Sequence, residues 1–428
     1  MISVLNRLQL LSGNKLLLAI GLALSLGACT PRVGVLRSPD HKGGNLGGTT
    51  SPKDDKSPGA QETNDKSEAG LKGKRVLENS IALVLPFQLD RLTPNALSTE
   101  DVKRSAIALD FYQGFQLGLD ELAKNGSSFS LNVLDSRDNE MANVAIAKSE
   151  DVANAALVVG PVYPKEIRAF GASVPQKGVL QINPLAASKA SEFNLPNLVS
   201  LTPSIDIHTK VMAGKVAHDY STGDVVVIYN TADNDGRQFL SGFVSELKRA
   251  KPNIQVTSVS SVNQLNEVLT TTGTNMIVAG TTDKFQLRTL LNNLGKKATE
   301  SFYLFNLYGH PLWDRIDFSS YEDFASFNPV ITTESHLKSW TGEVKKFRDS
   351  YYTLYGVHPS DHSYKGYDAA RYFGTLLAKY GENYRDHLTK ERFNGLFSAY
   401  EFSYNQASGF VNSALSFKTY RGSSFQLN

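Results

Sequence analysis

Runs of apolar residues that end in polar or proline-containing turns recur along the chain from residue 80 onward. The runs at 81–85, 155–159 and 225–229 are apolar throughout. A continuous apolar run bounded by turn residues is typical of a strand buried on both faces, as in a parallel sheet. Between the runs, apolar residues recur at the spacing of one helix face, for example over 106–122. This alternation predicts an α/β protein with doubly wound parallel sheets.

The alternation occurs twice and then changes, which predicts two units, each about the size of one domain, followed by a mixed tail. In the first unit we predict strands over 80–86, 130–134, 155–161 and 178–182, with helices that end near 125, 152 and 174. After an extended passage at 198–203, we predict helices over 207–220, 237–249 and 285–294 and strands over 224–229, 254–259, 274–279 and 302–305. In the tail we predict a strand over 329–332, helices over 337–354 and 362–380, and a β-pair of 400–403 with 415–418.

The N-terminus has the pattern of an export signal. Arg7 and Lys15 precede an apolar run over 16–26, which is followed by the small residues Gly27 and Ala28. The run is shorter than the roughly 20 residues that a membrane-spanning helix needs. An ordinary secretory signal and an N-terminal anchor helix remain the alternatives to the interpretation given next.

The end of this signal, Leu-Gly-Ala-Cys at 26–29, resembles a bacterial lipoprotein box, in which the chain is cleaved before the cysteine and the cysteine is acylated. The single cysteine of the chain stands at the position that this box requires. The resemblance implies a signal peptide over 1–28, lipidation of Cys29 and an anchor in the bacterial envelope, facing the periplasm. Because Thr30 and not an aspartate follows the cysteine, the resemblance favours the outer membrane. The alternative for Cys29 is a buried thiol.

Residues 29–79 lack aromatic side chains and are rich in Gly, Ser, Pro, Lys and Asp. Such a segment cannot bury enough apolar surface to offset the entropy of ordering, which predicts a disordered tether. The chain as a whole carries 44 Lys+Arg and 42 Asp+Glu, so its net charge of +2 gives no field directed at nucleic acid. One cysteine excludes an internal disulfide framework and a Cys-rich zinc site.

The folded part resembles the type I periplasmic binding protein fold, whose best-known members are the leucine/isoleucine/valine-binding proteins. The resemblance runs from Ser80 to the C-terminus and is carried by 81–86 with 111–115, by 158–161, by 182–184 and by 226–229. It implies two Rossmann-like lobes joined by a three-strand hinge, with crossings near 201–205, 328–333 and 399–402. The implied lobes are 80–203 plus 333–400 and 204–332 plus 401–428.

Ligands of parallel α/β sheets bind beyond the carboxyl ends of the strands, which places the ligand of this fold between the lobes. The candidate ligand contacts are residues of the turns that follow the strands, namely Gln88, Asp135, Arg137, Tyr163, Lys165, Ala187, Ser188, Tyr229, Asp233, Asp283, Asn306 and Tyr308. Two of these turns depart from the amino-acid-binding members. Tyr163 to Lys165 stands where those members offer a serine, and 185–188 reads Leu-Ala-Ala-Ser where they carry a small residue, Ala and Thr.

Ligand ammonium groups are held by acidic residues in the amino-acid-binding members, and these have no clear counterpart, although Asp233, Asp235 and Asp283 lie on suitable turns. Aromatic residues also follow strands, and in a cleft they would stack on a sugar, a nucleoside or an apolar side chain. They are Tyr163, Tyr229, Phe305, Tyr308 and Trp313. The alternative is that they pack into the lobes, which we expect for about half of them.

Enzymatic chemistry has little support in the sequence. His358 and His362 have the spacing of a metal pair on one helix turn, but Pro359 disfavours a helix there and predicts a solvated loop. The pair Asp135 and Asp138 fits a ligand-contacting or helix-capping turn better than an acid–base pair. We find no nucleophile elbow, phosphate loop or dinucleotide fingerprint, and we predict no cofactor, no metal and no catalysis.

We therefore predict an envelope-anchored solute-binding lipoprotein that closes two lobes on a small polar ligand. The resemblance implies an amino-acid-like receptor of an ABC-type uptake or sensing system. Its partners would be a small molecule (an amino acid, a peptide or a cell-wall fragment) and a membrane permease. A nucleic-acid partner, as in the DNA-binding repressors that share this lobe pair, is excluded on two grounds. An export signal precedes Ser80, and no helix-turn-helix does.

An alternative function follows from a second resemblance. Residues 82–86 and 160–162 are equally similar to the C-terminal domain of the lipoprotein activator of penicillin-binding-protein synthases. That resemblance implies an interaction module that regulates peptidoglycan synthesis, with a cell-wall synthase as its partner and no transported ligand.

Overall fold

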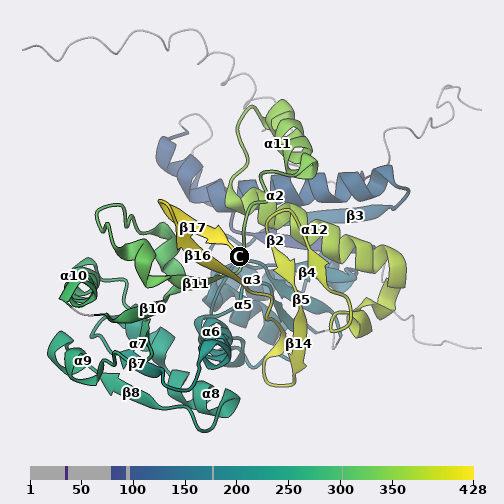
Figure 1. Ribbon diagram of the computed structural model, residues 1–428. Helices are drawn as coiled ribbons and strands as arrows, with labels where there is room; N and C mark the ends of the chain where they lie inside the picture. Colours follow the sequence, from purple (N-terminus) through teal and green to yellow (C-terminus); the bar gives the residue numbers. More distant parts are fainter. Residues whose placement is uncertain (1–33, 37–78, 93–96, 176–177, 301) are drawn as a thin grey trace, which may run out of the picture.

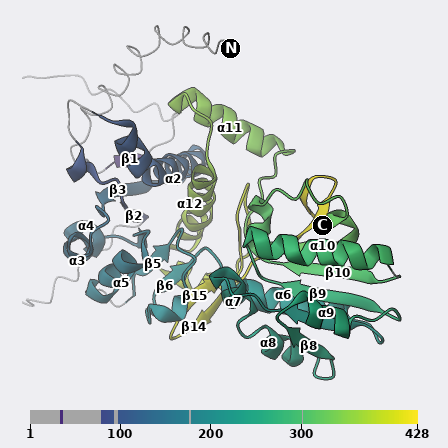
Figure 2. The ribbon, with the colours of Figure 1, turned by 90° about the vertical axis from the view of Figure 1, so that its left-hand side faces the viewer.

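The computed structural model describes residues 34–36, 79–92, 97–175, 178–300 and 302–428. These residues form two lobes, each built on its own sheet, and Figure 2 shows the two lobes side by side. The predicted signal peptide, the lipidation site Cys29 and most of the predicted tether lie outside the described residues. In the described part of the chain, no helix combines the length and the apolar character needed to cross a bilayer.

The sheet of the first lobe has eight strands in the order β1-β3-β2-β4-β5-β6-β15-β14. Their bounds are β1 Gly34–Leu36, β2 Ser80–Leu85, β3 Phe129–Asp135, β4 Leu157–Val159, β5 Leu180–Asn183, β6 Leu198–Ser200, β14 Phe402–Asn405 and β15 Gly409–Asn412. The strands from β3 to β15 in this order run parallel, and β1 and β14 pair antiparallel at the two edges. Strand β2 is buried along its whole length, as its apolar run predicts.

Helices cover both faces of this sheet (Figure 1). They are α2 Thr99–Lys124, α3 Glu140–Ala147, α4 Glu150–Ala153, α5 Pro164–Ser173 and α12 Asp361–Tyr380, with the 3-10 turns η1 Leu89–Arg91, η2 Ala190–Glu192 and η5 Gly381–His387. Helix α11 Gly342–Tyr355 packs on α2 and α12 and not on the sheet. Helices α2 and α12 approach each other closely through glycines. A Cβ on Gly114 would lie 1.8 Å from the carbonyl oxygen of Ser363, and one on Gly366 would lie 2.1 Å from that of Phe111. Glycine at these positions therefore allows the backbones to touch.

The sheet of the second lobe has seven strands in the order β17-β16-β11-β10-β9-β7-β8. The strands are β7 Val225–Tyr229, β8 Val256–Val259, β9 Thr274–Ala279, β10 Leu304–Gly309, β11 Val330–Thr333, β16 Ser416–Arg421 and β17 Ser424–Leu427. The helices are α6 Ile205–Asp219, α7 Asn234–Leu240, α8 Phe243–Ala250, α9 Val262–Val268 and α10 Lys284–Glu300, with the 3-10 turns η3 Pro311–Arg315 and η4 Phe324–Phe327. In β7, Val226 and Ile228 join one buried cluster while Val227 and Tyr229 join another, so this strand is buried on both faces.

The chain passes between the sheets three times: from β6 to α6, after β11, and from β15 to β16. The buried side chain of Asn412 joins the first and third of these passages. Its Nδ2 donates to the carbonyl oxygens of Leu201 (2.8 Å) and Ala399 (2.9 Å), and its Oδ1 accepts from the amides of Glu401 (2.9 Å) and Ala414 (3.0 Å). One amide thus saturates its hydrogen-bonding capacity at the hinge.

The tail departs from the predictions in two ways. The predicted β-pair of 400–403 with 415–418 is wrong, because β14 turns back at Gly409 to pair with β15, whereas β16 pairs with β11 and β17. For the same reason the third crossing lies at 413–415 and not near 399–402, so 402–412 belong to the first sheet and not to the predicted second lobe. A two-stranded sheet of β12 Phe393–Asn394 and β13 Ala399–Tyr400 was not predicted.

Two further predictions need correction. The single helix expected over 237–249 is two helices, α7 and α8, because Gly242 adopts a left-handed backbone with φ +78° and interrupts the helix. Within the predicted tether, Gly34–Leu36 is not free chain, since these residues pair antiparallel with β3 at its edge. An exposed strand edge offers unpaired backbone groups to any extended segment nearby.

Candidate functional site

A cavity of about 890 Å³ lies between the two lobes and receives side chains from both. The first lobe contributes Ile107, Val162, Tyr163, Pro164, Leu185, Ala186, Ala187, Ser188, Lys189, Glu192 and His362. The second lobe contributes Ile205, Asn234, Arg237, Gln238 and Ser241. The volume falls within the range of about 300–1,000 Å³ that is usual for small-molecule sites.

The turns after β4 and β5 form most of the first wall. Gly160, at the end of β4, has φ +105°, and a Cβ there would lie 1.9 Å from the carbonyl oxygen of Val84 on β2. Only glycine fits this close approach, which brings the residues after it to the edge of the cavity. After β5, the buried Asn183 folds the second turn: its Oδ1 accepts from the amide of Ala186 at 3.0 Å and its Nδ2 donates to the Ala186 carbonyl at 2.8 Å.

Tyr163 lies at the N-terminus of α5, next to the buried carboxyl group of Glu166. Its backbone amide donates to Glu166 Oε2 at 3.3 Å, and Asn143 donates to Glu166 Oε1 at 2.9 Å. Burial raises the pKa of the Glu166 carboxyl. Burial, together with the negative charges of Asp138 and Glu166, raises the pKa of Tyr163. The phenol therefore keeps its proton at neutral pH and can donate a hydrogen bond to a ligand.

Helices α2 and α12 bring Ile107 and His362 to the same wall. Ser360 caps α12 and fixes its start against α2, because its hydroxyl donates to Asp110 Oδ2 at 2.6 Å. Burial lowers the pKa of His362, and the neighbouring Lys365 lowers it further, so the ring is neutral at neutral pH. Within the described residues, its buried Nδ1 has no hydrogen-bond partner.

The second wall is one face of α7 together with the start of α6. Asn234, Arg237, Gln238 and Ser241 recur at the spacing of a helix face and all line the cavity. Asp233 is the N-cap of this helix, and its carboxylate accepts from the amide of Gly236 at 2.9 Å. The guanidinium of Arg237 donates to the carbonyl of Ala232 at 2.7 Å through one nitrogen, which leaves its other donors available.

Predicted contacts from the first lobe divide into two groups. Tyr163, Ala187 and Ser188 line the cavity. The others of this lobe, all within the described residues, do not line it: they are Gln88, Asp135, Arg137 and Lys165. Asp135 organises its own turn instead, since its two carboxylate oxygens accept from the backbone amides of Gln88 (2.9 Å), Leu89 (2.8 Å) and Arg137 (2.9 Å).

None of the predicted contacts from the second lobe lines the cavity, although the structure describes all of them: Tyr229, Asp233, Asp283, Asn306 and Tyr308. Asp233 caps α7 as described above. Asp283 accepts from the amides of Phe285 (3.0 Å) and Gln286 (2.9 Å) at the start of α10. Asn306 accepts from Asn328 at 3.2 Å, and Tyr229 is 5% exposed within a hydrophobic cluster.

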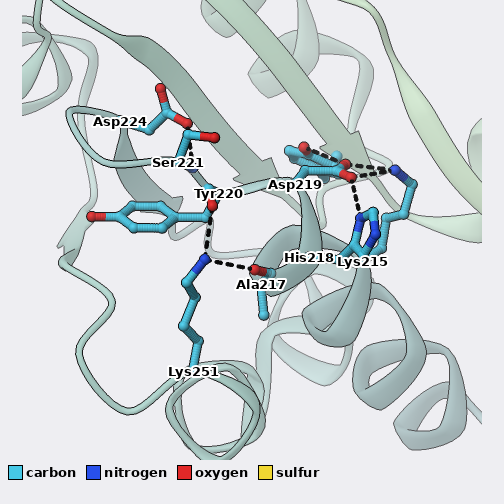
Figure 3. Close-up of polar contacts among 9 residues, drawn as sticks. Lys215, Ala217, His218, Asp219, Tyr220, Ser221, Asp224 and Lys251 are labelled. Carbon is cyan, nitrogen blue, oxygen red and sulfur yellow. Dashed lines mark hydrogen bonds and ion pairs between the residues drawn. The ribbon is translucent and has the colours of Figure 1, made fainter.

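Tyr308 also points into the second lobe, where its hydroxyl donates to Asp219 at 3.0 Å. Figure 3 shows the surroundings of that carboxylate at the C-terminal end of α6, where Lys215 also binds it. Burial alone would raise the pKa of Asp219, but hydrogen bonds from Lys215, His218 and Tyr308 outweigh it and lower the pKa. Burial and the charge of Asp219 raise the pKa of Tyr308.

Of the aromatic residues predicted for the cleft, Tyr163 alone lines the cavity in the described part of the chain. Trp313 is fully buried and its indole donates to the carbonyl of Thr281 at 2.8 Å, while Phe305 packs on Phe327. The predicted loop at His358 is separate from the cavity, and His358 stacks on Tyr352 with ring centroids 5.0 Å apart. Among the described residues, no group of three or more His, Cys, Asp or Glu side chains is placed to hold a metal ion.

Cavity residues that the sequence reasoning missed lie mainly on helices and in the second half of the β5 turn. They include Ile107, Lys189, Glu192, Ile205, Asn234, Arg237, Gln238, Ser241 and His362. The signal for the α7 group was available: four polar residues at positions 234, 237, 238 and 241 form one helical stripe. The stripe was not recognised because the helix was predicted to begin at 237, which left Asn234 outside it, whereas α7 begins at Asn234.

Solved structures of the same architecture exist, although no family model and no curated protein sequence matches the chain. A branched-chain amino acid ABC transporter protein from Rhodospirillum rubrum superposes with a TM-score of 0.55 at 18% identity, covering 82% of this chain and 100% of that one. An ABC transporter substrate-binding protein from Desulfitobacterium hafniense gives 0.52 at 16% identity, with 82% and 99% covered. The C-domain of LpoA from Haemophilus influenzae, a regulator of PBP1A, gives 0.51 at 15% identity, with the same coverage. The chain therefore has the fold of the type I periplasmic binding proteins, as the resemblance implied.

Proposed function

We propose that this chain is an envelope-anchored binding protein that closes its two lobes on a small polar ligand. The observation that carries the proposal is the cavity of about 890 Å³ whose walls come from both lobes. A ligand that contacts both walls binds the closed form better than the open form, and this differential affinity is what drives closure.

The composition of the walls supports a small polar ligand. Hydroxyl, amide, cationic and anionic side chains converge on the cavity, and apolar side chains lie between them. Such a mixture is typical of ligand pockets, in which apolar surface supplies affinity and a few polar groups fix orientation. The structural neighbours from Rhodospirillum rubrum and Desulfitobacterium hafniense are described as an ABC transporter protein and as a substrate-binding protein, which supports the same role here.

A thermal-shift screen over amino acids, short peptides and muropeptides tests the proposal, with small-angle scattering on any hit. A ligand at a hundred times its Kd stabilises the native state by about 2.7 kcal/mol. For a chain of this size that amounts to a rise in Tm of about 4 °C. We expect at least one compound to give such a rise and to reduce the radius of gyration.

A matched pair of variants assigns the effect to the cavity. Ala187→Trp places an indole in the cavity and is expected to abolish the ligand-induced rise in Tm. Ala250→Trp adds the same side chain at an exposed position at the end of α8 and is expected to leave the rise unchanged. Absence of any response in the whole screen would contradict a ligand-binding role.

We further propose that Cys29 carries the lipid anchor and that the lobes face the periplasm from the outer membrane. The support is the position of the only cysteine at the end of an export signal. Incorporation of labelled palmitate into the wild-type chain, but not into Cys29→Ser, is the expected result. Fractionation of the two membranes then locates the anchored protein, and recovery in the inner membrane would contradict the outer-membrane assignment.

A second candidate function is an interaction module for a cell-wall synthase. Two observations favour it: the similarity to the C-domain of LpoA, and the use of Asp233 and Asp283 as helix caps and not as cavity groups. Crosslinking of the full chain to detergent-solubilised envelope synthases, with and without screen hits, separates the two functions. Association that is insensitive to Ala187→Trp and to every small molecule supports the interaction module.

A further inference from the structure

The charged side chains of the cavity are arranged across the two lobes. Lys189 comes from the first lobe, next to the β5 turn, and Arg237 comes from α7 of the second lobe. Glu192 is the single acidic side chain among the described residues that line the cavity. His362 adds no charge at neutral pH because burial lowers its pKa. The walls therefore carry an excess of positive charge.

We infer that the ligand is an organic carboxylate with net negative charge, held by Lys189 and Arg237 from opposite lobes. This inference rests on the proposed function and names the chemical class of its ligand. An arginine guanidinium presents a planar fork that matches a carboxylate, and a lysine ammonium adds a point charge from the other side. Ser188 and Tyr163 supply hydroxyl donors on the first wall.

Closure itself depends on such an anion. When the lobes approach each other, two cations on facing walls repel each other, and the loss of solvent strengthens that repulsion. An anion between them turns the same two charges into attractive partners. The closed form is thus disfavoured when the cavity is empty and favoured when a carboxylate occupies it.

A ligand ammonium group finds no carboxylate on the second lobe within the described residues that line the cavity, where only neutral amide and hydroxyl oxygens could accept from it. The three second-lobe aspartates that the sequence placed on suitable turns make other contacts: Asp233 and Asp283 cap helices, and Asp235 accepts from the hydroxyl of Thr282 at 2.5 Å. The lining has one acidic side chain, Glu192, and two cationic ones, so a zwitterion gains less from these walls than an anion of the same skeleton.

The apolar part of the wall has room for a hydrocarbon portion. Ile107, Val162 and Leu185 line the first lobe side and Ile205 the second. Burial of apolar ligand surface against them supplies affinity without direction, while the two cations fix the carboxylate end. The expected ligand is therefore amphiphilic, with an acid at one end and a hydrocarbon skeleton at the other.

Matched compounds on one skeleton test the inference with the mature full-length chain. The probes are 4-methylpentanoate (an anion), 4-methylpentanamide (neutral) and leucine (a zwitterion), followed by hexanoate and 3-phenylpropanoate with their amides. We expect calorimetry to give the anion at least tenfold tighter binding than its amide, and tighter binding than the zwitterion. Raising the salt concentration from 0.05 to 0.5 M is expected to weaken binding of the anion and to leave that of the amide unchanged.

Variants assign the charge effect to the two side chains. Arg237→Gln and Lys189→Gln are each expected to weaken carboxylate binding at least tenfold while amide binding stays the same. Arg288→Gln on α10 and Lys148→Gln after α3 remove one positive charge from exposed positions outside the cavity, and are expected to change neither.

Equal affinity for carboxylate and amide, or insensitivity to both variants, would overturn the inference. Tight binding and closure with leucine or a neutral compound would overturn it while leaving the binding function intact. If no carboxylate, amide or zwitterion binds, both the inference and the proposed function fail, and the crosslinking experiment on the synthase decides what replaces them.

Discussion

The two lobes share one architecture but line the cavity with different structural elements: strand-end turns in the first lobe and a helix face in the second. The first lobe uses the turns that follow β4 and β5, which contribute Tyr163, Ala187 and Ser188. The second lobe uses the exposed face of α7, and its strand-end residues Asp233 and Asp283 cap helices. A similar strand-and-helix order therefore does not assign the same role to equivalent turns.

The difference has a local cause. In the first lobe, the side chain of Asn183 closes the β5 turn on itself, which leaves the residues after it free to face the cavity. In the second lobe, an aspartate sits directly before each of α7 and α10, where helix amides without partners require an acceptor. These two carboxylates therefore organise helix starts and do not line the cavity.

The largest expected effect is on the helix contact that supports the first wall. Gly114→Val forces a side chain into the Ser363 carbonyl and is expected to lower the free energy of unfolding by about 3 kcal/mol. In the second lobe, a Cβ on Gly214 of α6 would meet no atom of the described residues within 4 Å, so Gly214→Ala is expected to stabilise by up to about 1 kcal/mol. Denaturant unfolding of both variants measures the contrast, and equal effects in the two lobes would contradict it.

The next effect is at the hinge. Asn412→Ala leaves two carbonyl oxygens and two amides without their partner, which is expected to cost about 2–3 kcal/mol. Asn405→Ala, in the exposed turn of the same hairpin, removes one hydrogen bond to the amide of Ala407 and is expected to cost less than about 1 kcal/mol. Calorimetry checks whether the loss at Asn412 also separates the melting of the two lobes. A single unshifted transition would show that this amide does not couple them.

The sequence predicted the sheets well because their strands are uniformly apolar. Buried strands such as 81–85 and 225–229 need no partner information to be identified, since continuous burial requires continuous apolar residues. The hairpin of β14 and β15 was not predicted, and 400–403 was paired instead with 415–418, because a short edge strand that alternates aromatic and polar residues does not specify its partner. Tertiary contacts, and not the local sequence, determine which sheet edge a short strand joins.

The cavity was predicted for one lobe only, for a related reason. Tyr163 and Ser188 follow strands that end at the cavity, so their position in the sequence was sufficient. Asp233 also follows a strand, but its role depends on α7 starting at Asn234, three residues earlier than predicted. A helix boundary is the least certain element of a sequence pattern, and here it decides which residues line the cavity.

Acid is expected to act in opposite directions through two buried histidines of the second lobe and a buried aspartate of the first lobe. Burial lowers the pKa of His208 and of His310 in the second lobe to about 4, against a reference of 6.5. The unfolded chain therefore binds more protons between these values, and stability falls as the pH drops through this window. From pH 7 to pH 5 the loss is at most about 2 kcal/mol for each histidine.

In the first lobe, Asp368 behaves in the reverse way. Burial raises its pKa to about 6 from 3.8, although its carboxylate accepts from the amides of Leu396, Phe397 and Ser398. The folded state then binds the extra proton, so stability is lost as the pH rises through 6 and about 1 kcal/mol is gained from pH 7 to pH 5. Hydrogen exchange of β9 and α12 peptides at both pH values reports each lobe separately. Because His362 of α12 has a lowered pKa and opposes Asp368, the control is Asp368→Asn, and an unchanged pH response of α12 in that variant would contradict the role given to Asp368.

The smallest expected effect concerns the far end of α6, the helix whose first residue, Ile205, lines the cavity. Figure 3 shows Lys251 reaching back to the end of this helix, where its ammonium donates to the carbonyls of Tyr220 (2.8 Å) and Ala217 (3.4 Å). A cation at a helix C-terminus satisfies free carbonyls and the helix dipole, so Lys251→Ala is expected to cost about 1 kcal/mol. Lys248→Ala, exposed on the preceding helix α8, is the matched control and is expected to cost less than about 0.5 kcal/mol.

Because the contact is remote from the α7 face, ligand affinity is expected to stay the same in both variants. A loss of affinity in Lys251→Ala alone would mean that the second wall depends on the whole length of α6, and not on α7 as the comparison of the lobes implies.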